Sequence, residues 1–389
     1  MADYEVSKLM WMGIVVALAA GVFTIAQPNI KTESQTVLDK VAQVVNGIDT
    51  KSDTPPTSDS KEHVASTSTL NLDIARHPMT ASDIKSVIDV LPNGGFKNIS
   101  LRLGDAQHLM YKSEYLKNSN SEALSIKEIK DIVSYAKSKN ITVIPDLDSP
   151  GHANALLAAL KESHPDVYNK VAMDEGTLDY TTPEAESLMK TLYDEVFDAF
   201  SGQSTQAFVV GADEVPGGQD LYSNSLLPFI NNLGDYANSK GFTPILWNDA
   251  VLKRDISKLS KNFSIFYWAQ GTHAPADMMP ELVKSTSTVQ DYNKAGIKVI
   301  NANDYANTFG INNIGNKGAE DYFLDYLQNT SNPTLFDEIV DNEGQWWTKE
   351  SLDNHGMVVS LWGENSDGIT SQQITDFVAR IKLPTVPTN

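Results

Sequence analysis

The chain has 389 residues and a formal net charge of -20, so it is long enough for one large domain with additions. The negative charge argues against nucleic acid as a partner, because phosphates attract basic surfaces; it suits cationic or neutral ligands, and also simple solubility. The sequence contains no cysteine, which excludes disulfides, thiolate metal sites and a cysteine nucleophile.

An uncharged, mostly apolar run covers residues 10–26. This run is nearly too short to span a membrane and is long for the apolar region of a signal peptide. Thr24-Ile25-Ala26 fits the small-residue pattern of a signal-peptide cleavage site. We therefore expect residues 1–28 to be a signal peptide or signal anchor, and the protein to be secreted or held at the cell surface by an N-terminal transmembrane segment. A buried core helix is the alternative. Residues 29–69 are expected to form a linker, since residues 51–69 are rich in Ser, Thr, Asp and Pro.

Strand-like apolar runs alternate with helix-like segments from residue 70 onward. The expected strands cover residues 70–75, 99–103, 142–147, 207–210, 244–247, 265–268, 298–302 and 357–362. The expected helices cover residues 82–91, 126–138, 183–200, 226–239, 280–295, 319–327 and 373–381. This alternation predicts an α/β protein with a single (β/α)8 TIM barrel over residues 70–389. A doubly wound open sheet is the alternative, but such sheets usually carry a glycine-rich phosphate loop after an early strand, and the sequence has none there.

Polar and aromatic side chains occur where these strands end. They are Asp73, Arg76, Asp105, Asp146, Asp148, Asp213, Glu214, Trp247, Asp249, Trp268, Asn303, Tyr305, Trp362 and Glu364. The most informative position is the end of the fourth strand, where two adjacent carboxylates, Asp213 and Glu214, follow the small pair Gly211-Ala212. Because the catalytic groups of a TIM barrel lie at the carboxyl ends of its strands, this pattern predicts one active-site face, and its side chains suit a sugar.

Several of these strand ends resemble motifs of glycoside hydrolase family 20, the β-N-acetylhexosaminidases. In chain order the motifs are residues 70–77, 143–152, 211–214, 246–249 and 361–364. The resemblance implies an exo-acting, retaining enzyme that removes terminal β-linked N-acetylglucosamine. It also implies a layout without the family's usual N-terminal α+β domain, as in a biofilm-degrading bacterial member. That layout favours poly-β-1,6-N-acetylglucosamine as the polymer, with chitin oligosaccharides, host glycans and cell-wall fragments left open.

The acid pair suits substrate-assisted glycoside hydrolysis. Adjacent residues cannot easily flank a bond from opposite sides, but they can act together where the 2-acetamido oxygen of the sugar attacks its own anomeric carbon and gives an oxazolinium intermediate. The resemblance then implies that Glu214 is the general acid and base and that Asp213 holds the acetamido N–H. Taken alone, such a pair is also typical of a solvated strand end.

The resemblance also assigns roles around the acid pair. Trp247, Trp268 and Trp362 are expected to form an aromatic box around the acetamido methyl group and the sugar face, although a single tryptophan at a strand end more often packs in a core. Tyr305 is expected to bond the acetamido carbonyl, with a position at the rim as the alternative. Asp249 completes the strand-end contacts expected with the substrate.

Arg76 and Glu364 fit recognition of hydroxyl groups on the non-reducing-end sugar, because a guanidinium donates hydrogen bonds and a carboxylate accepts them. An ion pair of Arg76 with Asp105 or Asp148 is the alternative, and both can hold together. Asp105 is expected to orient its neighbours or contact hydroxyls, while Asp148 and His152 are expected to tune the general acid.

No metal or cofactor is expected. A metal site of His152 with Asp146 and Asp148 is the alternative, but no second histidine lies at ligand spacing in the sequence. The expected partner is therefore an oligo- or polysaccharide that contains N-acetylglucosamine, without nucleic acid and with an N-terminal membrane anchor as an open alternative.

The chain departs from the usual family pattern at four places. Val209 stands where His is common, Ala212 where a second Gly is common, and Asp146 where Glu is commoner. Residues 216–218, Pro-Gly-Gly, stand where an aromatic residue follows the acid pair in the single-barrel layout. Two alternatives stay open: a lacto-N-biosidase-like enzyme that releases a disaccharide, and a non-catalytic glycan-binding barrel. The retained acid pair argues against the second.

Overall fold

A computed structural model describes residues 62–63, 68–268, 285–304, 306–329, 331, 333, 336, 356–384 and 386–387. All of them fall in one compact unit, Ser60–Asn389. The expected signal segment, residues 1–28, and nearly all of the expected linker lie outside the described residues, as does Tyr305. None of the helices in the described part of the chain is long and apolar enough to span a membrane.

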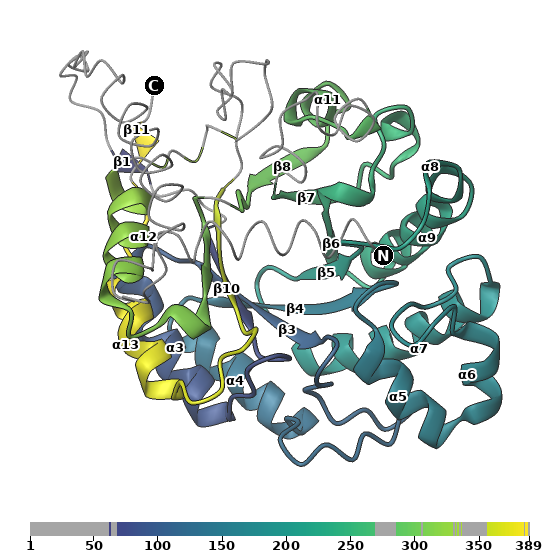
Figure 1. Cartoon of the computed structure of the whole chain (residues 1–389), viewed down its shortest axis with the longest axis horizontal. Helices are drawn as coiled ribbons and strands as arrows, with labels where there is room; N and C mark the ends of the chain where they lie inside the picture. The colour runs from purple at the N-terminus through teal and green to yellow at the C-terminus, as the bar shows by residue number, and fades with distance from the viewer. Residues whose placement is uncertain are drawn as a thin grey trace, which may run out of the picture. The chain divides into compact units, whose positions relative to one another are not determined.

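The strands build a parallel barrel. Nine of them pair in the order β8-β7-β6-β5-β4-β3-β2-β10-β9. They are β2 (Thr69–Asp73), β3 (Asn98–Gly104), β4 (Thr142–Ser149), β5 (Ala207–Gly211), β6 (Thr243–Trp247), β7 (Ser264–Tyr267), β8 (Lys298–Asn301), β9 (Thr308–Gly310) and β10 (Val358–Trp362). Every predicted strand overlaps an observed one, and the predicted barrel architecture is confirmed (Figure 1). A separate antiparallel pair joins β1 (Glu62–His63) to β11 (Val386–Pro387).

The barrel closes at its seventh position, which two short strands share. A parallel bridge between Asn301 and Met357 joins the end of β8 to the residue before β10, and β9 pairs with the far end of β10. The backbone bonds from Asn301 N to Gly356 O (3.0 Å) and from Ser360 N to Asn307 O (2.8 Å) complete this seam. β9 has no counterpart among the predicted strands.

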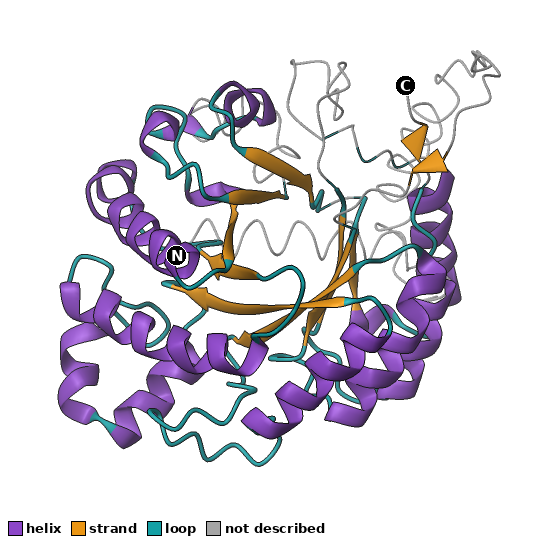
Figure 2. Cartoon of the chain, turned by 180° about the vertical axis from the view of Figure 1, so that it is seen from behind, coloured by secondary structure: helices purple, strands orange, loops and turns teal. Residues whose placement is uncertain are grey.

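Helices form the outer layer around the strands, as Figure 2 shows. They are α3 (Ala81–Gly94), α4 (Ile126–Ser138), α5 (Asn154–Ser163), α6 (Pro165–Val171), α7 (Pro183–Phe200), α8 (Gln219–Leu221), α9 (Leu227–Ser239), α11 (Val289–Lys294), α12 (Lys317–Asn329) and α13 (Ser371–Arg380), with the short π-helix η2 (Tyr222–Leu226) before α9 and the 3-10 turn η5 (Ile311–Asn313) before α12. Each predicted helix overlaps one of these. The short helices α5 and α6 are additional, and α5 buries Leu156, Leu157 and Leu160.

The regular alternation breaks between β6 and β7. Residues 248–263, all of them described, hold the 3-10 turns η3 (Asn248–Ala250) and η4 (Ile256–Lys258) and no α-helix. The predicted helices likewise include none between the strands expected at residues 244–247 and 265–268. The run of polar residues from Lys253 to Asp255 interrupts any apolar stripe that a helix would need to bury.

Side-chain caps fix where several helices begin. Thr80 and Asp83 form a capping box at α3, and Ser125 and Glu128 form another at α4. The hydroxyl of Thr182 accepts a backbone N–H at the start of α7. Such caps satisfy N–H groups that lack a partner within the helix and contribute about 1 kcal/mol each.

The barrel interior divides into an apolar and a polar half. Alternate residues of a strand point to opposite faces, so Leu70 and Leu72 of β2 pack outward in the main core while the residues between and after them face inward. The apolar half of the interior consists of Ile144, Ala207, Val209, Ile245, Trp247, Phe266, Ile300, Ala302 and Val358. The polar half comes from β2, β3 and β4 and consists of buried Asn71, Asp73, Ser100, Arg102 and Asp146. Charged groups therefore meet aromatic ones at the carboxyl ends of the strands.

Candidate active site

The acid pair follows β5 in a tightly fixed turn. Gly211, Ala212 and Glu214 have φ angles of 101°, 64° and 49°, in the left-handed region that favours glycine. A Cβ atom on Gly211 would lie 1.7 Å from Oδ1 of Asp148, so only glycine fits there. The N–H of Ala212 donates to the same Oδ1 at 2.9 Å and lies 2.9 Å from the carbonyl oxygen of Ser149, to which it also donates. The close approach of β4 and β5 thus fixes the backbone turn that carries Asp213 and Glu214.

The turn gives the two acids different surroundings. The side chain of Asp213 is 13% exposed, whereas that of Glu214 is 42% exposed. Oδ2 of Asp213 lies 3.4 Å from Nη2 of Arg102, while its Oδ1 is buried and has no hydrogen-bond partner among the residues that the structure describes. Glu214 is therefore open to a ligand, and Asp213 keeps one buried acceptor free.

A buried arginine holds the carboxylates of three strands together. Arg102 on β3 is fully buried, and its Nε donates to Oδ2 of Asp105 at 2.7 Å. Its Nη2 donates to Oδ2 of Asp148 at 2.8 Å and to Oδ2 of Asp213 at 3.4 Å. Arg102 is not among the predicted site residues, although a charged side chain inside the apolar run 99–103 indicates a paired, inward-facing position.

The guanidinium sets the charge of the carboxyl groups around it. Burial opposes ionisation of Asp213 and Asp105, but the positive charges of Arg102 and His152 outweigh burial and lower the pKa of both carboxyls. Burial and the charge of Asp213 raise the pKa of Asp148. The network therefore keeps Asp213 ionised. Asp148 is the carboxyl of the two that takes up a proton more easily.

His152 lies beside both acids. Its Nε2 is 3.5 Å from Oε2 of Glu214 and 3.6 Å from Oδ2 of Asp213, and its Nδ1 is 3.7 Å from Oδ1 of Asp105. Burial lowers the pKa of the imidazole, but the carboxylates of Asp105 and Glu214 outweigh burial and raise it to about 11. His152 therefore lies beside Glu214 and Asp148 interacts with Asp213, while the expected tuning of the general acid by these two residues stays a prediction.

Arg76 joins the ends of the first, second and last barrel strands. Its Nη1 donates to Oε1 of Glu364 at 2.8 Å and to Oδ2 of Asp73 at 3.3 Å, and its Nε donates to Oδ1 of Asp105 at 3.1 Å. Of the two ion pairs considered for Arg76, the pair with Asp105 forms. The side chain of Glu364 is 51% exposed, so its carboxylate is accessible while it orients the guanidinium.

Three tryptophans gather over the apolar half of the barrel. The ring centroids of Trp247 and Trp362 are 6.0 Å apart, and Trp247 also packs edge-on against Phe266. Trp268 and Trp362 are partly buried and pack on the same cluster. Cζ of Arg102 lies 5.3 Å from the centre of the Trp362 ring. The rings expected to form a box thus share one cluster, with Trp247, 2% exposed, as its buried base.

Asp249 lies in η3 at the end of β6 and is 8% exposed. Its Oδ2 accepts the backbone N–H of Glu214 at 2.6 Å, and its Oδ1 accepts the indole N–H of Trp268 at 3.0 Å. Burial and the charge of Asp213 raise the pKa of Asp249 to about 7. The sequence predicts a substrate contact for Asp249, but the structure commits both of its carboxyl oxygens to protein donors.

Two departures from the family pattern are neighbours in space. The register of β4 and β5 pairs Asp146 with Val209. Val209 is buried in the apolar half, and neither carboxyl oxygen of Asp146 has a hydrogen-bond partner among the described side chains and backbone. Burial raises the pKa of Asp146 to about 7, so this carboxyl takes up a proton near neutral pH.

The loop after the acid pair is held by two tyrosines from elsewhere in the chain. The hydroxyl of Tyr180 donates to Pro216 O at 2.8 Å, and the hydroxyl of Tyr222 donates to Val215 O. A Cβ atom on Gly217 would lie 2.6 Å from the oxygen of Tyr180, so the loop needs glycine for this approach. Aromatic side chains reach the loop from outside it, which its own sequence does not reveal.

Two carboxylates and a histidine of the site lie close enough together to be candidate metal ligands. Asp148, His152 and Asp213 offer ligand atoms within 4.8 Å of one another. Arg102 donates to both Asp148 and Asp213. A fixed positive charge on these oxygens repels a cation, so the donors fit an ion-pair network better than a metal site.

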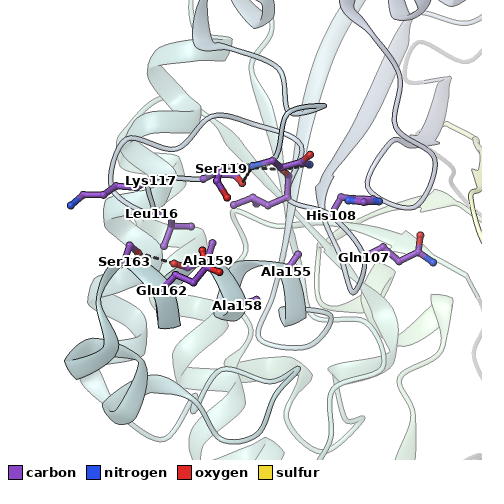
Figure 3. A pocket seen from close by; sticks show the side chains of 13 residues that line it. Gln107, His108, Leu116, Lys117, Ser119, Ala155, Ala158, Ala159, Glu162 and Ser163 are labelled. Atoms are coloured by element: carbon purple, nitrogen blue, oxygen red, sulfur yellow. Dashed lines mark hydrogen bonds between the residues drawn. The ribbon is translucent and has the colours of Figure 1, made fainter.

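A separate pocket of about 500 Å³ lies between the loop after β3 and helix α5 (Figure 3). It is lined by Gln107, His108, Leu109, Leu116, Lys117, Asn118, Ser119, Asn120, Ala155, Ala158, Ala159, Glu162 and Ser163. Nδ2 of Asn118 donates to Leu109 O at 2.8 Å and to Tyr111 O at 2.7 Å, so part of the polar lining holds the loop itself.

Relatives with curated functions are similar to part of this chain. The lacto-N-biosidase of Bifidobacterium bifidum is 28% identical over 200 residues, which is 45% of this chain and 17% of that protein. The β-hexosaminidase subunit β of Sus scrofa is 24% identical over 252 residues, which is 59% of this chain and 45% of that protein. The chain therefore spans less than half the length of these two relatives.

Solved structures share the fold at low identity. Dispersin B, whose single-barrel layout the sequence suggests, superposes with a TM-score of 0.72 at 22% identity, over 81% of this chain and 97% of that chain. A catalytic module of the pneumococcal exo-β-D-N-acetylglucosaminidase StrH gives a TM-score of 0.66 at 21% identity, over 82% of each chain. The model of the family described as glycosyl hydrolase family 20, catalytic domain, matches residues 69–377. The barrel, its acid pair and this match together establish that the chain belongs to glycosyl hydrolase family 20 and carries the catalytic domain of that family.

Proposed function

We propose that the chain is a retaining β-N-acetylhexosaminidase that hydrolyses terminal β-linked N-acetylglucosamine. The observation that carries the proposal is the free acceptor beside the exposed acid. Oδ1 of Asp213 has no partner among the described residues, while Oδ2 is bonded to Arg102, which keeps the carboxyl ionised. An acetamido N–H is a donor that suits such an acceptor.

The proposed reaction uses the substrate as its own nucleophile. The acetamido oxygen forms a bond to the anomeric carbon as the glycosidic C–O bond breaks, and Glu214 gives its proton to the leaving oxygen. Asp213 accepts the acetamido N–H and stabilises the positive oxazolinium intermediate. Water then adds to the anomeric carbon and gives a proton to Glu214, so the product keeps the β configuration and the acetamido group is restored.

The surrounding side chains support binding of one terminal sugar. Arg76 and Glu364 form a 2.8 Å ion pair that offers donors and acceptors to neighbouring hydroxyls. The partly buried rings of Trp268 and Trp362 give an apolar wall for the sugar face and the acetamido methyl group. His152, whose raised pKa keeps it cationic, lies beside both acids and balances their charge.

Release of a disaccharide is the second candidate. It is favoured by the likeness to the lacto-N-biosidase of Bifidobacterium bifidum. A disaccharide needs space beyond Arg76, and there the guanidinium is held by Glu364 and Asp105, which supports the single-sugar reaction. Chromogenic N-acetylglucosaminide and lacto-N-bioside substrates separate the two, and faster release of the disaccharide would replace our proposal.

The natural polymer and the location of the enzyme are further parts of the proposal. The 50 acidic and 30 basic residues suit a cationic, partly deacetylated poly-β-1,6-N-acetylglucosamine, and the apolar run 10–26 supports export. Activity on such a polymer is expected to fall between about 20 and about 500 mM salt, while activity on a small neutral substrate stays level. If activity on both substrates depends on salt in the same way, the charge of the protein has no part in selecting the polymer. Full-length, uncleaved protein in the cytosol would contradict export.

Glu214→Gln tests the general acid. The variant is expected to lose roughly 10²–10⁴-fold in kcat/KM on a substrate with a poor leaving group, and less in the first step with an activated phenolate. Glu162→Gln, an exposed residue of the pocket in Figure 3, is the matched control and should keep wild-type activity. Equal, small losses on both substrates would refute the role. A wild-type protein that is inactive on both substrates would favour the alternative of a non-catalytic glycan-binding barrel.

Asp213→Asn tests the acetamido contact. A thiazoline mimic of the oxazolinium is expected to bind the wild type roughly 10–100-fold more tightly than the variant, because a charged acceptor is lost. Circular dichroism checks that the variant folds. Equal affinity for both proteins would remove Asp213 from the mechanism.

A further inference from the structure

The end of β6 braces the two strand ends beside it. Oδ1 of Asn248 accepts the backbone N–H of Trp268 at 2.8 Å, and its carbonyl oxygen accepts the hydroxyl of Tyr292 at 3.1 Å. In the next residue, the two carboxyl oxygens of Asp249 accept from the Glu214 N–H at 2.6 Å and from the Trp268 indole at 3.0 Å. One short 3-10 turn therefore ties the loop of the acid pair to the aromatic cluster.

The backbone of Glu214 explains why such a brace is needed. Its φ of 49° is left-handed, which costs a residue with a Cβ atom about 1–2 kcal/mol. Its N–H donates to the carboxylate of Asp249, which is 8% exposed. Without that acceptor, the amide would lose its bond at a site with little water, and the loop would lose the contact that offsets its unfavourable conformation.

We propose that Asp249 is a positioning residue that fixes Glu214 and Trp268 relative to each other and does not bind the substrate itself. The inference rests on the proposed function in taking Glu214 as the proton donor and Trp268 as part of the sugar-binding wall. Both partners are N–H donors, so a carboxylate, with two acceptor oxygens, satisfies both at once. A displacement of about 1 Å between catalytic groups costs on the order of 10²-fold in rate.

A double-mutant cycle tests the coupling. Asp249→Asn keeps the shape of the side chain but offers one oxygen and one NH₂ group, so it satisfies only one of its two donors. We expect kcat/KM to fall roughly 10–100-fold in the wild-type background. In Trp268→Phe the indole donor is gone, and the amide oxygen can turn to the Glu214 N–H. In the Trp268→Phe background, Asp249→Asn should lower kcat/KM by less than about threefold. Equal losses in the two backgrounds would overturn the proposal.

A spectroscopic readout separates this positioning from the reaction. At a pH above the raised pKa of Asp249, about 7, the indole N–H signal of Trp268, assigned by its absence from Trp268→Phe, is expected to move upfield in Asp249→Asn because a charged acceptor is lost. The matched control is Asp255→Asn, a carboxyl 3% exposed in the same β6–β7 connection whose side-chain partners are Ser223, Lys258 and Arg254. It should leave the signal and the kinetics unchanged.

The two failures are distinguishable. A wild type inactive on every N-acetylglucosaminide, with an indole signal that still shifts in Asp249→Asn, would refute the proposed function and support the brace. An active wild type whose indole signal and kcat/KM are unchanged in Asp249→Asn would overturn the brace and leave the function standing.

Discussion

Replacing Arg102 with methionine removes the guanidinium that three strands share. Asp105, Asp148 and Asp213 accept from it at 2.7, 2.8 and 3.4 Å, and its side chain is fully buried. Deleting one partner of a buried ion pair costs about 3–5 kcal/mol, because it leaves an uncompensated buried charge. We therefore expect Arg102→Met to lose about 3–5 kcal/mol of unfolding free energy near neutral pH, which lowers Tm by roughly 10 °C.

The loss should depend on pH in a definite direction. Arg102 and His152 hold the pKa of Asp105 and Asp213 below the usual value, so in the wild type these carboxylates contribute stability that is present above about pH 4 and is lost as the pH falls further. Without the guanidinium their pKa values rise, the carboxyls take up protons on mild acidification, and the cost of burying them shrinks. The gap between wild type and variant is thus widest near neutral pH and narrows toward about pH 5.

Urea unfolding followed by tryptophan fluorescence at the two pH values measures both effects. Lys130→Met is the matched control, because Lys130 is 51% exposed and its partner Asp198, at 2.8 Å, is 70% exposed. This surface pair is expected to contribute less than about 1 kcal/mol. A loss below about 1 kcal/mol for Arg102→Met, or a gap that does not narrow in acid, would refute the reasoning.

Three further outcomes are expected. Gly211→Ala should abolish activity and lower Tm, because the new Cβ would lie 1.7 Å from Oδ1 of Asp148; Gly202→Ala, with a φ of 83° and open space around it, should cost only about 1 kcal/mol and keep activity. Ala212→Gly should gain up to about 1 kcal/mol by relieving a φ of 64°, and a lower urea midpoint would contradict this. The ring signals of His152, with a pKa raised to about 11, should show no titration between about pH 5 and about pH 9 by NMR, and an inflection near its usual pKa, about 6.5, would speak against the ion-pair network.

The barrel strands were predictable because parallel strands are buried on both faces and read as short apolar runs. Residues 142–147 and 207–210 lie within β4 and β5, and the polar residues after them fall at the same end of the barrel. The acid pair was predictable for the same reason, since adjacent residues after one strand stay adjacent in any fold. Its placement needs no knowledge of distant contacts.

The network around the acids was not predictable from local pattern. Arg102 bonds Asp148 and Asp213, which are 46 and 111 positions away in the chain, so its partners follow only from the strand order and register. Asp249 follows a strand like the expected substrate ligands, but the 3-10 turn η3 directs its carboxylate to backbone and indole donors. Periodicity predicts which face of an element is buried; it does not predict which polar groups meet there.

The shared seventh position of the barrel makes one seam of the sheet weaker than the others. The strands β3 and β4 pair from Asn98–Thr142 to Gly104–Leu147 with one register shift, whereas among the described residues the closing side relies on the Asn301–Met357 bridge and on the three-residue β9. Sub-global opening begins where the fewest backbone bonds must break together. Amide protons of β8 should therefore exchange with deuterium before those of β4. We expect the barrel to open first on the side opposite the carboxylate network.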